Sequence, residues 1–139
     1  MRKTEIVTIF LDAENRRNWK KWSSFVDSDI EYEPVGFAAT RGKRAYVSRM
    51  KKAYKELKDW QFEIVNITEN KNSVMVEFDG YGHFTGAEDE VQYTNVPLHL
   101  KAVCIFEVKN GKIIHIREYL DSQSYKKQLE VSNASGSVQ

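Results

Sequence analysis

Apolar positions recur every three or four residues in the first part of the chain and every second residue in the later part. The first pattern predicts three helices: one beginning at Thr4, one beginning at Asn18, and one from Thr40 to about Leu57. The side chains at helical spacing are Ile6, Ile9, Phe10 and Ala13, then Trp19, Trp22 and Phe25, then Tyr46, Met50, Ala53 and Leu57. A short strand at 27–32 is predicted between the second and third helices.

The alternating pattern predicts strands at 60–68, 73–84, 98–108 and 112–120, with an acidic loop at 86–92. Asp121 is a suitable cap for a last helix ending near Leu129, and the polar tail at 132–139 is expected to be disordered. We therefore predict a single α+β domain at 1–131. Its helices gather on one face of a mostly antiparallel sheet of about four to six strands.

The hairpin at 98–120 turns at Asn110-Gly111, and its register decides which side chains share a face. A two-residue turn would place Ile114 opposite Glu107. A three-residue loop pairs side chains of like polarity instead, which is the more stable arrangement. It places Ile114 opposite Phe106, Ile116 opposite Cys104, Glu118 opposite Ala102 and Leu120 opposite Leu100. We adopt the second register, which leaves Glu118 as the one carboxylate on an apolar face.

The preceding hairpin carries two glycines on its apolar side. The register predicted there places Phe62 opposite Gly80 and Ile64 opposite Phe78. Glycine within a strand usually marks a bend or a close approach, so Gly80 and Gly82 predict a sheet that curls around a space. Helices closing such a sheet would make a cone with an apolar cavity for one small ligand.

Glu118 is the leading candidate for chemistry. Burial disfavours a charged carboxylate, so an apolar wall should raise its pKa and suit it to general acid or base work near neutral pH. The alternative is a structural role, in which Glu118 bonds to a backbone group or pairs with an arginine. The residues that would line the pocket, or simply fill the core, are Trp22, Phe25, Tyr32, Tyr46, Met50, Phe62, Phe78, Leu100, Cys104 and Ile116.

The histidines offer weaker candidates. Strand pairing would place His99 opposite Asp121, although Asp121 also suits a helix cap. Asp79, Tyr81 and His83 alternate along one strand, and a β-bulge at the glycines would bring Tyr81 or His83 to the pocket mouth. The histidines lack metal-ligand spacing and no phosphate-binding loop is present, so we expect neither a metal nor a cofactor.

Composition excludes several function classes. The 139 residues carry 21 Lys and Arg against 20 Asp and Glu, a net charge of +1, and one cysteine, Cys104. This balance and the lack of a targeting segment predict a cytoplasmic protein that binds neither nucleic acid nor membrane. The basic side chains of the third helix are expected to form a solvated face: Arg41, Lys43, Arg44, Arg49, Lys51, Lys52, Lys55 and Lys58.

The order of several weak motifs resembles the nuclear transport factor 2-like superfamily, and most closely its SnoaL-like branch. That branch includes polyketide cyclases, ketosteroid isomerases and limonene epoxide hydrolases. The resemblance covers roughly 4–130. Its motifs are Phe10-Leu-Asp-Ala-Glu-Asn-Arg-Arg-Asn-Trp19, Asp27-x-Asp29-Ile-x-Tyr32, Gly42, Gly80-Tyr-Gly-His-Phe-Thr-Gly86, Phe106-x-x-x-x-Gly-Lys-Ile113 and Arg117-Glu-Tyr-Leu-Asp121.

The resemblance implies a cone-shaped α+β fold with an apolar pocket, often dimeric through the outer sheet face. Epoxide hydrolases of this kind carry Arg-Asp-Tyr-Phe-Asp on the last strand, where the first Asp acts in the cavity, and Glu118 falls on that position. They also carry an Arg-x-Asp pair on the strand that here spans 75–81, where none is present. The water-activating set is therefore incomplete.

Three hypotheses follow for function. The leading one is a domain that binds a small hydrophobic molecule and acts as an isomerase, cyclase, lyase or hydrolase through Glu118. The second is a module of the same fold that binds a ligand or protein without catalysis. The third is a purely structural dimeric accessory. A reachable Glu118 with a second polar group nearby would favour the enzyme.

Overall fold

The computed structural model describes residues 1–138, and Gln139 lies outside the described residues. The helices of the described part are α1 (Lys3–Asn15), α2 (Trp19–Ser24), α3 (Lys43–Glu56) and α4 (Ser122–Val138). Its strands are β1 (Val26–Pro34), β2 (Thr40–Arg41), β3 (Gln61–Glu69), β4 (Ser73–Glu88), β5 (Val91–Lys109) and β6 (Lys112–Leu120).

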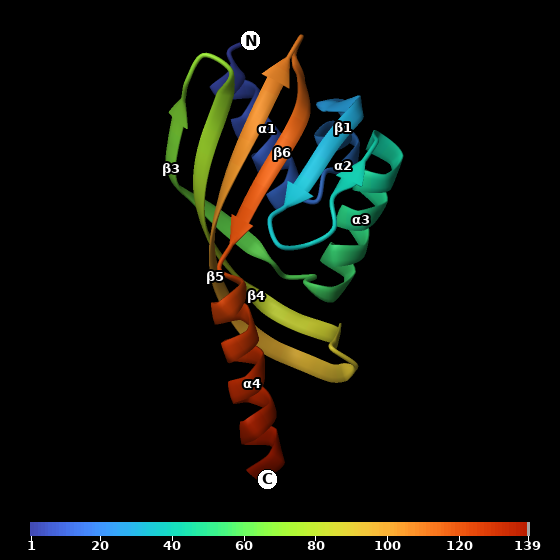
Figure 1. Ribbon diagram of the computed structural model, residues 1–139, viewed down its shortest axis with the longest axis vertical. Helices are drawn as coiled ribbons and strands as arrows, with labels where there is room; N and C mark the ends of the chain where they lie inside the picture. The colour runs from blue at the N-terminus through green and yellow to red at the C-terminus, as the bar shows by residue number, and fades with distance from the viewer. Residues whose placement is uncertain (139) are drawn as a thin grey trace.

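The strands form one curved sheet in the order β2-β1-β6-β5-β4-β3. All neighbouring pairs are antiparallel except β1 and β6, which run parallel. The sheet does not close, because β2 and β3 are its two edges, and the N-terminal helices lie against its concave side (Figure 1). This arrangement confirms the predicted α+β class and curved sheet.

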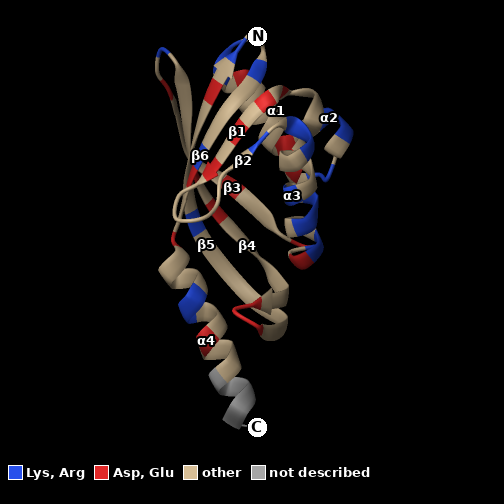
Figure 2. Ribbon diagram, turned by 45° about the vertical axis from the view of Figure 1, so that its right-hand side comes forward, with Lys and Arg blue, Asp and Glu red and all other residues tan. Residues whose placement is uncertain are grey.

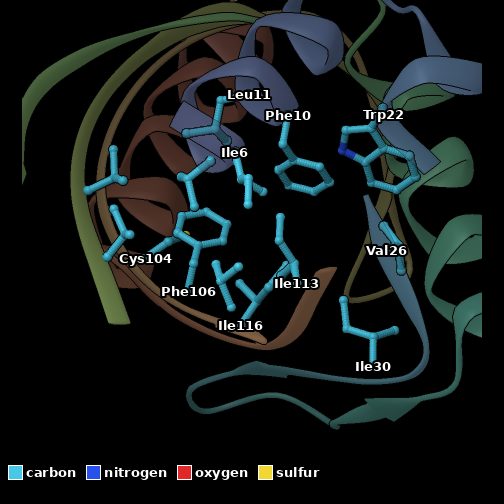
Figure 3. Packing of buried hydrophobic residues seen from close by; sticks show 14 of the residues in the cluster. Ile6, Phe10, Leu11, Trp22, Val26, Ile30, Cys104, Phe106, Ile113 and Ile116 are labelled. Carbon is cyan, nitrogen blue, oxygen red and sulfur yellow. The ribbon is translucent and has the colours of Figure 1, made fainter. Parts of the chain in front are cut away.

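The main core lies between α1 and the concave side of the sheet. Phe10 of α1 stacks on Trp22 of α2 with ring centroids 5.3 Å apart, and contacts Phe106 of β5 edge-on at 6.1 Å (Figure 3). Asn18 caps α2 as predicted, its side chain accepting a hydrogen bond from the amide of Lys21 at 3.2 Å. Through Phe10, helix α1 thus packs against both α2 and the sheet.

The start of α3 differs from the prediction. Thr40 does not cap this helix but lies in β2, opposite Tyr32 of β1. Gly42 occupies the cap position with a φ of 95°, a conformation that side chains other than glycine rarely adopt. The extra edge strand was missed because two residues are too few for an alternating pattern.

The register of the β5–β6 hairpin also differs. Lys109 pairs with Lys112 across a two-residue turn, in which Asn110 and Gly111 have φ values of 52° and 74°. Such a turn matches the twist of the strands. A bulge next to it then turns Ile113 rather than Ile114 into the core, so that Glu118 lies opposite Cys104. The observed pairing differs from the predicted one by two residues, which leaves Glu118 on the predicted face.

The segment at 86–92 is not a loop. Strand β4 continues to Glu88 and β5 begins at Val91, with only Asp89 and Glu90 at the turn, both at positive φ. The resulting long hairpin extends beyond the main sheet beside α4 (Figure 1). A second apolar cluster fills this region, formed by Phe84, Val96, Leu98, Leu100 and Leu129.

Helix α4 begins as predicted but is longer. Asp121 caps it by accepting a hydrogen bond from the amide of Ser124 at 3.0 Å. The helix continues to Val138, past the predicted end near Leu129. The proposed domain limit at 131 stays a prediction. Within the described residues, no helix has the length and apolar character needed to cross a membrane.

Candidate functional site

A cavity of about 220 Å³ lies where the two apolar clusters meet, between α1, α3 and the concave side of the sheet. Of the residues predicted for a pocket, eight line it: Tyr32, Tyr46, Met50, Phe62, Phe78, Leu100, Cys104 and Ile116. Trp22 and Phe25 do not. Trp22 is fully buried against Tyr46, and Phe25 packs at the edge of the main core.

The two strand glycines make room for Trp60 rather than for a ligand. The predicted pairs Phe62–Gly80 and Ile64–Phe78 are confirmed. A Cβ atom at Gly80 would overlap the indole of Trp60, and one at Gly82 would lie 2.9 Å from the Trp60 Cα. The indole therefore lies directly against the β4 backbone and forms part of the cavity wall.

Glu118 projects into this cavity from β6. Its Oε1 accepts a hydrogen bond from the Tyr32 hydroxyl at 3.0 Å, and its Oε2 lies 3.8 Å from the Cys104 thiol. Burial raises the pKa of Glu118, while the hydrogen bonds from Tyr32 and Cys104 act in the opposite direction. The side chain keeps partial solvent access because it faces the cavity. Neither a backbone group nor an arginine is bonded to it among the described residues.

Arg49 packs over the ring of Tyr32 and is itself held by hydrogen bonds. The Arg49 guanidinium lies 5.1 Å from the centroid of the Tyr32 ring and donates hydrogen bonds to the Ala38 carbonyl at 2.6 Å and to the Thr40 hydroxyl at 2.7 Å. Burial and the nearby Glu118 charge raise the pKa of Tyr32, so its hydroxyl remains a neutral donor. Arginine, aromatic ring and carboxylate thus form one continuous arrangement.

A second carboxyl, Glu14 of α1, also lines the cavity and was missed by sequence analysis. It is almost fully buried and accepts hydrogen bonds from Trp22 Nε1 at 3.0 Å and from the Tyr54 hydroxyl at 2.5 Å. Burial raises its pKa to about 7, against the opposite effect of these two donors. The signal was present in the sequence, because Glu14 follows Phe10 and Val7 at helical spacing.

The outer face of the sheet holds the remaining candidates away from the cavity. The ring of Tyr81 stacks on that of His99 at 4.2 Å, and His99 is bonded to Asp79. His83 pairs with Asp59 at 2.6 Å. Neither Tyr81 nor His83 lines the cavity, because the bulge in β4 falls after Phe84 rather than at the glycines.

The predicted His99–Asp121 pair is wrong. His99 lies opposite Tyr81 of β4, and Asp121 caps α4, because the register of the last hairpin differs by two residues. Across the described part of the chain, no cluster of three or more His, Cys, Asp or Glu side chains is arranged to hold a metal ion.

Comparison with known proteins agrees with the resemblance stated above. Residues 4–129 match the family model described as SnoaL-like polyketide cyclase. No curated protein matches the chain significantly.

Several solved structures share the fold. A proposed SnoaL-like polyketide cyclase from Shewanella putrefaciens has a TM-score of 0.83 at 14% identity, over 93% of this chain and 96% of that one. A proposed polyketide cyclase from Xanthomonas campestris pv. campestris has a TM-score of 0.79 at 19% identity, over 91% and 95%. An LEH-like epoxide hydrolase of M. tuberculosis has a TM-score of 0.76 at 21% identity, over 96% and 93%.

Proposed function

We propose that this chain, which belongs to the SnoaL-like polyketide cyclase family, is an enzyme that binds a small hydrophobic carbonyl compound. Glu118 would act as a general base, removing a proton from the carbon next to the carbonyl. One observation carries the proposal: a carboxylate of raised pKa, held by Tyr32 through one oxygen, lines an apolar cavity.

The two oxygens of Glu118 have different roles in this proposal. Oε1 is held in position by the Tyr32 hydroxyl, whereas among the described residues Oε2 accepts only the weak hydrogen bond of the Cys104 thiol at 3.8 Å. Oε2 is therefore free to accept a proton from a ligand. A raised pKa makes the ionised carboxylate a stronger base than an exposed glutamate, which favours proton transfer near neutral pH.

The size and lining of the cavity limit the substrate. Its volume of about 220 Å³ lies below the roughly 300–1,000 Å³ typical of pockets for drug-sized ligands. Apart from Glu14, Glu118, the tyrosines and Cys104, its walls are apolar. These features support a substrate of one or two small rings with few polar atoms.

Epoxide hydrolysis is less well supported. Strand β4 carries no arginine beside its acidic residues, and Asp79 lies on the outer face in a pair with His99. No second charged group is therefore supplied by β4 to help a carboxylate activate water. Proton transfer at carbon needs only Glu118 and a group to hold the carbonyl oxygen.

Hydrogen–deuterium exchange tests the proposal with a class of substrates rather than with one compound. The protein would be incubated in D₂O with small cyclic ketones, and loss of the protons next to the carbonyl followed by NMR. We expect catalysed exchange with wild type and at least about a 100-fold loss in Glu118→Gln, the range for removing a general base. Glu77→Gln, on the exposed side of β4, is the matched control and should retain full exchange.

The same experiment separates the enzyme from a binding module. A ketone that binds without exchange in wild type would contradict the enzyme hypothesis and support a domain that only holds its ligand. Exchange that persists in Glu118→Gln would contradict the role of Glu118.

We further propose that the chain forms a homodimer through the outer face of the sheet. Large apolar side chains are exposed there, including Met75 at 41%, Tyr81 at 50% and Tyr119 at 46%. Light scattering should give twice the chain mass of 16.2 kDa. Substituting Tyr119 by Lys should then reduce the mass to that of a monomer.

A further inference from the structure

Tyr46 occupies a fixed position in the cavity wall. It lies in the first turn of α3 and is only 2% exposed. Its ring stacks on Trp22 at 5.3 Å and packs against Tyr32 at 5.1 Å. Packing on both sides leaves the ring little freedom, so the direction of its hydroxyl is set by the fold.

The hydroxyl of Tyr46 lacks a hydrogen-bond partner in the described part of the chain, although buried tyrosine hydroxyls normally have one. The hydroxyl is not fully enclosed by protein atoms, and Tyr46 lines the cavity. The small exposed fraction of this side chain therefore includes its hydroxyl. The cavity wall therefore includes a tyrosine whose hydroxyl has no protein partner among the described residues.

The neighbouring tyrosines are already engaged. Tyr32 donates to Glu118 at 3.0 Å and Tyr54 donates to Glu14 at 2.5 Å. Burial and the nearby carboxylates raise the pKa of Tyr46, so its hydroxyl keeps its proton across the physiological range. Of these three cavity tyrosines, Tyr46 is the one whose proton is available to a ligand oxygen.

We propose that Tyr46 is the substrate-binding donor that holds the carbonyl oxygen while Glu118 acts on the adjacent carbon. The proposal rests on the proposed function and names its substrate class: an enolisable ketone whose other atoms are apolar. A charged substrate such as a carboxylate is disfavoured, because both Glu14 and Glu118 line the same small cavity.

The step balances without a further reactant. The C–H proton passes to Glu118 Oε2, and the electron pair of that bond forms the carbon–carbon double bond of an enolate. The carbonyl π pair moves to the oxygen, where the negative charge is stabilised by the hydrogen bond from Tyr46. Return of the proton from Glu118 to the same or a conjugated carbon restores the carbonyl.

The test uses Tyr46→Phe and cyclohexanone labelled with ¹³C at the carbonyl. Infrared difference spectra should show a bound carbonyl stretch at lower frequency in wild type, and that shift should be lost in Tyr46→Phe. Cyclohexanone should bind roughly tenfold more weakly to the variant, the effect of one hydrogen bond. Methylenecyclohexane, which has no carbonyl, should bind both proteins equally.

Stability separates a binding role from a structural one. Because the Tyr46 hydroxyl bonds to no protein group among the described residues, Tyr46→Phe should unfold at the same urea concentration as wild type. Tyr54→Phe, which removes a donor from Glu14, should unfold earlier. Tyr119→Phe on the outer face should change neither binding nor the infrared shift.

The outcomes distinguish this inference from the proposed function. A shifted carbonyl in Glu118→Gln without exchange is expected if both hold. A Tyr46-dependent shift with no exchange even in wild type would support Tyr46 as the donor to the carbonyl oxygen. It would contradict the role of Glu118 as the base. If wild type catalyses exchange but Tyr46→Phe leaves the carbonyl shift and the cyclohexanone affinity unchanged, the role of Tyr46 is wrong. The role of Glu118 as the base would still stand. Failure of cyclohexanone to bind wild type would also overturn it.

Discussion

The two faces of the sheet treat carboxylates in opposite ways. On the concave side, burial raises the pKa of both Glu14 and Glu118. On the exposed surface, Asp59 has a lowered pKa because His83 is bonded to it, and Glu31 has a lowered pKa because Arg41 is bonded to it. A raised pKa suits the carboxyl groups of the concave side to proton transfer, whereas a lowered pKa keeps those of the exposed surface ionised.

Partners differ in kind between the two faces. The buried carboxylates accept hydrogen bonds from neutral groups such as Trp22 and Tyr32, which cannot compensate fully for lost hydration. Of the exposed ones, Glu31 pairs with Arg41 and Asp59 with His83. Figure 2 shows basic residues along α3 and acidic residues at the tip of the β4–β5 hairpin. The comparison teaches that burial with neutral donors, rather than the presence of a carboxylate, distinguishes the cavity side of this sheet from its exposed side.

The largest expected effect comes from neutralising Glu14. Its pKa rises from 4.5 to about 7 on folding, so the folded protein binds this proton more tightly than the unfolded chain. The resulting stability is fully present below pH 4.5 and is lost as the pH rises through about 7, a change of about 3 kcal/mol. Glu14→Gln should flatten this part of the stability curve, measured by urea unfolding from pH 4.5 to 8.

One control variant sharpens this measurement. Glu5→Gln, at an exposed position of the same helix, should leave the pH dependence unchanged. An equal slope in wild type and Glu14→Gln would contradict the assignment of a buried, raised-pKa carboxyl to Glu14.

An intermediate effect is expected from Tyr32→Phe. The Tyr32 hydroxyl stabilises the ionised form of Glu118, so its removal should raise the pKa of Glu118 further. Carbon-detected NMR of Glu118 should show its titration moving to higher pH. At pH values above that titration, the free energy of unfolding should fall by about 1–2 kcal/mol. A normal or lowered pKa of Glu118 in wild type would undermine its proposed role as a tuned base.

The smallest effect is expected from an outer pair. His99 and Asp79 are bonded to each other at the surface, and exposed pairs contribute between roughly 0 and 1 kcal/mol. Asp79→Asn should therefore change stability by less than about 1 kcal/mol and leave ketone exchange intact. A large loss of exchange in this variant would mean that the outer face takes part in catalysis, and the comparison would fail.

Local patterns in the sequence were enough to predict much of the fold. Helical spacing located α1 and the Asn18 cap located α2, while alternation located the long strands. The face of Glu118 was predicted despite a wrong register, because side chains on a strand alternate with a period of two and the register error was two residues. Eight of the ten predicted pocket residues line the cavity, because strand alternation and helical spacing each identify the side of an element that faces the interior.

Glu14 shows where local reasoning stopped. Its helical position placed it on the buried side of α1, yet nothing local to it in sequence indicates that Tyr54, forty residues later, donates to it. Trp60 was likewise not expected against Gly80, since a glycine indicates close approach without saying which group approaches.

The sequence by itself determined the class of fold, the apolar faces and the one carboxylate of β6, because these depend on periodicity within single elements. The tertiary structure alone decided which polar groups meet in the cavity, which cavity tyrosine has no hydrogen-bond partner among the described residues and which histidines remain outside. Those outcomes depend on contacts between elements far apart in the chain, where a bulge or a two-residue turn changes the neighbours of every side chain beyond it.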